Sequence, residues 1–155
     1  MKVLIAVDNS DFSSRVVREI ASRIWSANTE ILVLSVMKNC TLPGSTDRFM
    51  QQRTILLESL LTTLNTKLTN CKISFEVVEG NAADEIISFA KKWQADLIVM
   101  GAHGESGIAR RKIGNVVVSV LNAAPCSVEI VKPRRSILAS VDKVSRSLKS
   151  VSKTI

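Results

Sequence analysis

The sequence predicts an α/β fold, a three-layer sandwich in which helices cover both faces of a five-stranded parallel sheet. Short apolar runs alternate four times with longer segments that carry apolar residues at helical spacing. The connections between these segments are short, and this alternation is typical of a parallel sheet with helices on both faces. The length of 155 residues suits one domain with a substantial core.

The first strand–helix–strand unit covers residues 2–37. Residues 2–7 and 30–37 are apolar runs that predict buried strands. The helix predicted between them, residues 10–26, begins with Ser10, a favoured N-cap residue. Its apolar side chains recur at helical spacing and predict one buried stripe formed by Val17, Ile20, Ala21 and Ile24.

The middle of the chain predicts a helix, a strand and a second helix. Residues 72–79 alternate apolar and polar side chains, as a strand with one wetter face would. Residues 47–68 predict a strongly amphipathic helix, and residues 82–93 return to helical spacing. The apolar positions of these three elements are Leu57, Leu60, Leu61, Leu64 and Leu68, then Ile73, Phe75 and Val77, then Ile86, Ile87 and Ala90.

Two strands, residues 96–100 and 127–132, flank a segment at 115–124 whose class is ambiguous. Three consecutive valines in this segment favour a strand. Gly114 before it and Pro125 after it are helix start and stop signals, and we predict a helix. Its predicted inner face consists of Val117, Val120, Leu121 and Ala124.

A glycine-rich connection joins the fourth strand to this last helix. Gly101 and Gly104 follow the strand, and Gly114 stands after nine further residues. Without side chains at these positions, backbone N–H groups can approach a phosphate at the positive end of the helix dipole. A merely flexible loop is the simpler interpretation, but the strand–loop–helix context favours a phosphate site. Asp8 also follows a strand, either as a ligand of a nucleotide or as a turn carboxylate before the next helix.

The net charge of +7 is concentrated near the end of the chain. Residues 134–155 hold six basic side chains and one acidic one, whereas residues 1–133 hold fifteen and thirteen. We therefore predict a nucleotide-binding domain at 1–133 and a basic amphipathic extension at 134–155. With few aromatic residues for stacking, no specific nucleic-acid site is expected.

Apolar residues recur in the extension at heptad-like spacing. The segment is expected to pack on the domain or on a partner copy. The alternatives are a helix that meets an acidic protein or an anionic surface, and a disordered basic tail. The apolar positions are Ile137, Val141, Val144, Leu148, Val151 and Ile155.

Several classes of site lack their residues in this sequence. Cys40, Cys71 and Cys126 are far apart and accompany one histidine, so neither a zinc site nor a disulfide framework is expected. The chain has no Walker-type phosphate loop, no evident general base and no carboxylate cluster for Mg²⁺. We therefore expect no enzyme, or at most very slow ATP hydrolysis. No apolar run approaches the roughly 20 residues that cross a bilayer, and we expect a cytoplasmic protein.

Three features together resemble the universal stress protein family over nearly all of residues 1–133. They are the opening VLIAVDNS at 3–10, the closing AAPCSV at 123–128 and the complete glycine pattern between them. The resemblance implies a sheet in the order 3-2-1-4-5, in which Asp8 lies beside the glycine loop. It also implies a homodimer that pairs through the last strand, residues 127–132.

Family members with this glycine pattern bind ATP, so the resemblance implies ATP as the ligand, with Mg²⁺ carried by the phosphates. Asp8 would then contact the adenosine, the backbone of Val36 and Met37 would line the adenine pocket, and the glycines would admit the ribose and phosphates. The loop residue His103 would lie near the phosphates, and Arg110–Lys112 would either reach them or form a surface charge run. The predicted site consists of Ala6, Val7, Asp8, Val36, Met37, Met100, Gly101, His103, Gly104, Gly114, Asn115 and Val116.

One position departs from the family pattern. Asn115 stands where the family usually has Ser or Thr, and its larger carboxamide could cap the helix and occupy the N–H groups that a phosphate needs. Two hypotheses follow from this. The first is a nucleotide-binding regulatory module, and the second is a nucleotide-free interaction protein that works through its basic tail.

Overall fold

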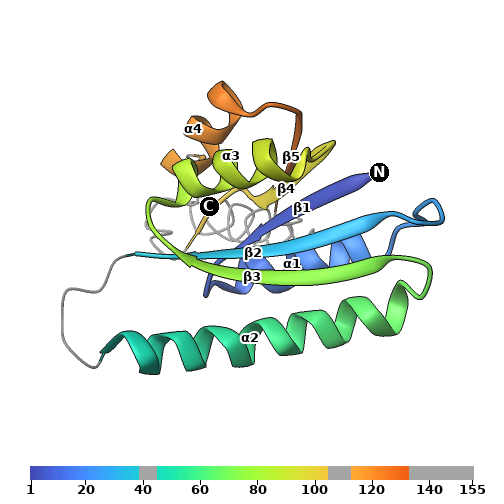
Figure 1. Ribbon diagram of the computed structural model, residues 1–155, viewed down its shortest axis with the longest axis horizontal. Helices are drawn as coiled ribbons and strands as arrows, with labels where there is room; N and C mark the ends of the chain where they lie inside the picture. Colours follow the sequence, from blue (N-terminus) through green and yellow to red (C-terminus); the bar gives the residue numbers. More distant parts are fainter. Residues whose placement is uncertain (39–44, 105–112, 133–155) are drawn as a thin grey trace, which may run out of the picture.

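The computed structural model describes residues 1–38, 45–104 and 113–132 (Figure 1). The elements are β1 (Lys2–Val7), α1 (Asp11–Ala21), β2 (Glu30–Met37), α2 (Ser45–Lys67), β3 (Lys72–Glu79), α3 (Ala82–Trp93), β4 (Leu97–Gly101), α4 (Asn115–Ala123) and β5 (Ser127–Val131). The strands form one parallel sheet in the order β3-β2-β1-β4-β5. The predicted fold class and strand order are confirmed, and each predicted element is present with ends that shift by a few residues.

The sheet is buried on both faces. Helices α1 and α2 cover one face, and α3 and α4 cover the other (Figure 1). Successive side chains of a strand point to opposite faces, so Val3 and Ile5 of β1 pack toward α1 and α2, whereas Leu4 and Ala6 pack toward α3 and α4. This alternation decides which strand residues can reach each side of the site described below.

Helix α1 ends five residues earlier than the sequence pattern predicts, and the prediction for Ile24 is wrong. The side chain of Ile24 is fully exposed. The N–H of Ser22 turns back to the carbonyls of the last helical turn, and its hydroxyl donates to the carbonyl of Glu19 at 2.8 Å. The indole N–H of Trp25 donates to the carbonyl of Ile20 at 3.0 Å, and its ring packs on the core in place of Ile24.

The ambiguous segment at 115–124 is a helix, as predicted. Val117 and Val120 of α4 are buried against the sheet. Leu121, which was also expected on the inner face, is 47% exposed. Helix α4 packs against α3 and the edge strand β5, and its contact with the core is narrower than the pattern suggests.

The remaining elements follow their patterns closely. Strand β3 lies at an edge of the sheet, which explains its wetter character and the exposure of Phe75. Among the described residues, no helix is long and apolar enough to cross a membrane. The leucines Leu57, Leu60, Leu64 and Leu68 are buried at α2, and Leu61 is half-buried.

An ion pair ties the end of α1 to the edge strand β5. Arg23 donates two hydrogen bonds to the carboxylate of Glu129, one of them at 2.8 Å, and also lies 3.4 Å from Glu19. These hydrogen bonds hold the pKa of Glu129 below its ordinary value and raise the pKa of Arg23. The pair is partly exposed, so it contributes modestly to stability.

Candidate functional site

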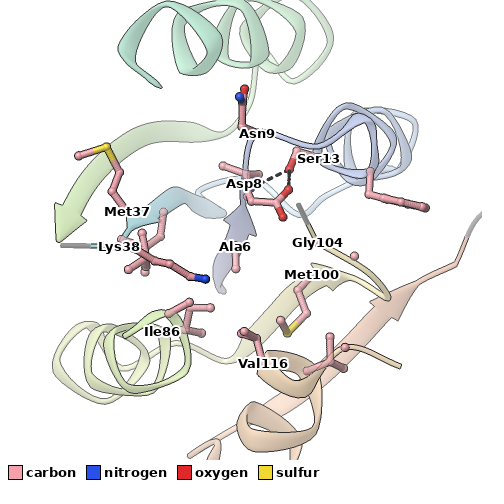
Figure 2. A pocket seen from close by; sticks show the side chains of 18 of the residues that line it. Ala6, Asp8, Asn9, Ser13, Met37, Lys38, Ile86, Met100, Gly104 and Val116 are labelled. Carbon is pink, nitrogen blue, oxygen red and sulfur yellow. Dashed lines mark hydrogen bonds between the residues drawn. The ribbon is translucent and has the colours of Figure 1, made fainter. Parts of the chain in front are cut away.

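A cavity of about 880 Å³ opens at the carboxyl ends of the strands. It lies beside β1, which stands between β2 and β4. At this point the order of the strands changes, because β2 and β3 are added on one side of β1 and β4 and β5 on the other. Ligands of doubly wound sheets bind at such points. All twelve residues of the predicted site line this cavity. Figure 2 labels Ala6, Asp8, Met37, Met100, Gly104 and Val116 among them. The structure therefore brings the predicted site together, while the role of each residue as a ligand stays a prediction.

Asp8 is held rigidly at the mouth of the cavity by the start of α1. Its Oδ1 accepts hydrogen bonds from the backbone N–H of Ser10 and the hydroxyl of Ser13, both at 3.0 Å, and from the hydroxyl of Ser10. The hydroxyl of Ser13, which is buried, also accepts from the backbone N–H of Asp8 at 2.8 Å. Asp8 is thus a turn carboxylate that also lines the cavity, and its role as a ligand stays a prediction.

Ser10 occupies the N-cap position of α1, but its side chain does not cap the helix. It makes no hydrogen bond to the N–H groups of the first turn, and its hydroxyl donates to Asp8 instead. The sequence pattern therefore identified the N-cap position correctly, but the expected cap does not form. A carboxylate two residues earlier is a strong acceptor, and the hydroxyl of Ser10 donates to it instead of accepting from the helix.

The glycine loop runs against Asp8 and α1. A β-carbon at Gly101 would lie 3.3 Å from a carbon of Phe12 and from the carbonyl of His103. A β-carbon at Gly104 would lie even closer to the carboxylate of Asp8. A side chain at Gly104 would therefore force Asp8 or the loop to move, whereas one at Gly101 would need a shift of a few tenths of an ångström.

The first turn of α4 faces the cavity without a side-chain cap. Gly114 is its N-cap residue and has no side chain to offer, and Asn115 is the first helical residue. The N–H of Gly114 donates to the carbonyl of Ala102, which places the start of α4 beside the glycine loop. Asn115, Val116 and Val117 all line the cavity. The carboxamide of Asn115 is exposed and makes no cap, so the predicted obstruction of these N–H groups is not observed.

The neighbouring helix α3 provides an internal comparison. It begins at the same edge of the cavity, but the side chain of Asn81 accepts hydrogen bonds from the N–H groups of Ala83 at 3.0 Å and Asp84 at 3.3 Å. Helix α3 is thus capped by a side chain, whereas no side chain of the described residues caps α4. An uncapped helix start at a cavity is suited to an anionic ligand, because its N–H groups and dipole favour negative charge.

His103 lines the cavity, but its ring nitrogens are not presented to it. Both nitrogens are shielded from solvent and have no hydrogen-bond partner among the residues that the structure describes. The ring packs on Phe12, with ring centroids 5.4 Å apart. A ligand could not reach these nitrogens without a local rearrangement, and a packing role against α1 fits this geometry better than direct phosphate binding.

Sequence reasoning missed two groups of cavity residues. The first is an apolar floor formed by Leu34 and Ile86 beside the predicted Ala6, Val36 and Met100. Strand alternation could have identified Leu34, because it shares a face with Val36. The second group is polar and comes from several separate elements, so no local pattern marks it: Asn9, Ser13, Lys38, Gln52, Arg53, Glu79 and Asn81.

Among the described residues, no group of three His, Cys, Asp or Glu side chains could hold a metal ion. Cys71 and Cys126 are free thiols, and burial raises the pKa of each. Arg110–Lys112, Cys40 and the extension at 134–155 lie outside the described residues.

Residues 1–132 match the profile of the universal stress protein family. Universal stress protein MJ0531 of Methanocaldococcus jannaschii is 48% identical over 61 residues, which is 39% of this chain and 36% of that protein. The match therefore spans about a third of that relative's length. Universal stress protein YxiE of Bacillus subtilis is 26% identical over 145 residues, covering 84% of this chain and 98% of the relative.

Solved structures share the fold at lower sequence identity. The structure of protein MJ0577 has a TM-score of 0.77 and 20% identity, and the match covers 87% of this chain and 97% of that one. A universal stress protein in complex with cAMP has a TM-score of 0.63 and 24% identity, with 84% and 95% covered. An Arabidopsis thaliana family protein with AMP bound has a TM-score of 0.62 and 21% identity, with 86% and 92% covered. At these identities the similarity establishes the fold.

Proposed function

Because the chain belongs to the universal stress protein family, we propose that it is a regulatory module that binds an adenine nucleotide, with ATP as the principal ligand. The observation that carries this proposal is the contrast between two neighbouring helices. Helix α3 is capped by Asn81, whereas the start of α4 opens uncapped into the cavity. The AMP and cAMP complexes of proteins with the same fold support the choice of an adenine nucleotide.

In the proposed complex, the ligand lies across the ends of β1 and β4. The phosphates approach the N–H groups of the first turn of α4. The ribose lies against the wall that Asp8 and the glycine loop form together, and the base occupies the far side of the cavity. We call this side the base compartment and define it by Ala6, Leu34, Val36, Lys38 and Ile86.

The proposal includes little or no catalysis. Fast phosphoryl transfer needs positioned metal ions and a group that orients the nucleophile. In the part of the chain that the structure describes, no cluster of metal ligands is present, and the nitrogens of the loop histidine are shielded. Mg²⁺ would enter bound to the phosphates, with oxygen ligands from the nucleotide and water.

Homodimer formation through β5 and a cytoplasmic location belong to the same proposal. Strand β5 lies at the edge of the sheet, so one side of its backbone is available for pairing with a second copy. The free thiols of Cys71 and Cys126 fit a reducing compartment. The extension at 134–155 would then contact a protein or an anionic surface.

The direct test is to isolate the full-length protein gently and identify any co-purified small molecule by mass spectrometry. We expect an adenine nucleotide, and we expect ATP with Mg²⁺ to raise the melting temperature of the emptied protein. Binding to the folded state alone adds about 2.7 kcal/mol when the ligand is at 100 times its Kd. An empty site together with no thermal shift at millimolar ATP would count decisively against the proposal.

A second measurement separates this function from the tail-only hypothesis. Truncation after Lys132 should leave nucleotide affinity within about twofold of the full chain, because every described residue that lines the cavity precedes this point. If truncation instead abolishes binding, the extension is part of the site. Hydrolysis of ATP at more than a few turnovers per hour would contradict the assignment as a non-enzyme.

A further inference from the structure

The base compartment contains a single cationic side chain among the residues that define it. Ala6, Leu34, Val36 and Ile86 present apolar groups, whereas Lys38 presents an ammonium. Leu34 and Val36 lie on the face of the sheet that packs against α3 and α4, and alternation along the chain places Lys38 on the same side. Figure 2 shows the side chain of Lys38 extending from the end of β2 across the cavity toward Ala6, with its nitrogen foremost.

No carboxylate of the described residues holds this ammonium in place. The ion pairs among those residues join Arg23 to Glu19 and to Glu129, on the other side of the sheet. Lys38 is exposed to solvent within the cavity. Its charge can therefore meet a ligand without first breaking an ion pair with a described residue.

An apolar wall alone distinguishes ligands weakly, because one added or missing group in such a pocket changes affinity little. A group that must form a hydrogen bond discriminates much more strongly, since a ligand without the partner leaves it unpaired. An ammonium has three donors and no acceptor, so it can face a ring nitrogen of adenine but not the amino group.

We infer that Lys38 is a specificity-determining residue of the site, whose ammonium donates a hydrogen bond to one acceptor nitrogen of the bound purine ring. The inference rests on the proposed function and extends it from the phosphates to the base. It also assigns a role to a residue that lies outside the family's glycine pattern.

The test uses the full chain, with AMP and its 1-deaza, 3-deaza and 7-deaza analogues as probes. Each analogue replaces one acceptor nitrogen by a C–H group. The variants are Lys38→Met, which keeps the length and removes the charge, and Lys38→Arg, which keeps a donor. Lys92→Met is the matched control, because Lys92 is exposed and lies in the last turn of α3, at the end of that helix away from the cavity.

We expect Lys38→Met to weaken AMP binding about tenfold, the scale of a hydrogen bond to a charged group, and Lys38→Arg to recover part of the loss. The affinity of one deaza analogue for the wild type should be as low as the affinity of AMP for Lys38→Met. The affinity of that analogue should not change when Lys38 is replaced by Met. Lys92→Met should leave every affinity unchanged. Adenosine, which carries no phosphate, should lose affinity with Lys38→Met in the same proportion as AMP.

Two outcomes overturn the inference alone. If Lys38→Met weakens AMP and all three analogues equally but leaves adenosine unchanged, the ammonium acts on the phosphate. If the substitution changes no affinity, Lys38 makes no contact with the ligand. Failure of the folded wild-type chain to bind AMP, ATP or adenosine would overturn the proposed function and this inference together.

Discussion

Oδ2 of Asp8 lies only 2.5 Å from the position that a β-carbon at residue 104 would occupy. This carboxylate cannot swing away freely, because its other oxygen accepts hydrogen bonds from Ser10 and Ser13. The side chain of Asp8 and the backbone of Gly104 therefore form one tightly matched wall of the cavity.

Gly104→Ala should weaken nucleotide binding at least tenfold, because the added methyl group displaces either the loop or the carboxylate that would face the ribose. The loss in folding free energy should be about 1–3 kcal/mol, as for other overpacked sites. Calorimetric titration and denaturant unfolding measure the two effects.

A double-mutant cycle provides the control for Gly104→Ala. In an Asp8→Ala background the clash is removed, so the glycine substitution should cost much less stability than in the wild type. Equal costs in both backgrounds would show that Asp8 is not the obstacle.

Asn115→Asp should weaken ATP binding about tenfold while preserving or raising thermal stability. A carboxylate in the first turn of α4 interacts favourably with the helix dipole by about 0.3–1 kcal/mol. The same charge repels the phosphates that are proposed to bind there. Thermal melts with and without ATP test both effects on one sample.

Asn115→Ser is the neutral counterpart. Because the native carboxamide makes no cap and is exposed, ATP affinity should change less than about threefold, well below the effect of a lost charged hydrogen bond. A large gain in affinity would show that the native residue restrains the site after all.

Glu129→Gln should destabilise the protein at neutral pH but not in acid. The hydrogen bonds from Arg23 lower the pKa of Glu129 in the folded state, whereas the pKa of a glutamate in the unfolded chain is about 4.3. The stabilisation is therefore complete above that value and is lost as the pH falls through the lowered folded-state pKa.

Because both side chains are about one-third exposed, the difference at pH 7 should be about 1 kcal/mol or less. It should vanish once the pH has fallen below the lowered folded-state pKa of Glu129, because the wild-type carboxylate is then also protonated. Glu58→Gln, on the exposed side of α2, is the control. A difference that does not decline as the pH falls would assign the effect to packing rather than to charge.

Ile20→Ala and Ile24→Ala should differ sharply, although the sequence pattern places both residues on one stripe. Ile20 is completely buried, so its truncation should cost about 2–4 kcal/mol of folding free energy. Ile24 is fully exposed, and its truncation should stay within about 0.5 kcal/mol. Urea unfolding of both variants decides whether α1 ends where the structure places its end.

The sequence predicted the strands well because each is a short apolar run that must be buried in a sheet covered on both faces. Strands at residues 2–7, 30–37 and 72–79 begin and end at the predicted residues. The end of α1 was missed because apolar spacing continues past the last helical turn. Trp25, one residue beyond the stripe, takes the core position and satisfies the carbonyl of Ile20. Such a replacement depends on tertiary contacts that periodicity does not contain.

The part of the candidate site that the sequence predicted is the part where the residue type itself indicates the role. Glycines after a strand and before a helix indicated the phosphate side, and all of them line the cavity. Lys38 was not predicted, because a lysine after a strand is usually a solvated charge. Only the assembled sheet shows that this side chain enters the cavity instead of leaving it. The packing of the His103 ring on Phe12 likewise depends on α1, which is distant in sequence.

Two backbone hydrogen bonds join the opening of α4 to the last strand. The N–H of Gly114 donates to the carbonyl of Ala102, and the N–H of Ala102 donates to the carbonyl of Val131, each at 3.1 Å. These hydrogen bonds connect the first turn of α4 to the carboxyl end of β5 through the single residue Ala102. Any displacement of Gly114 has to stretch this short chain of peptide groups or carry Val131 with it, and Val131 is the point from which the chain departs toward its basic end.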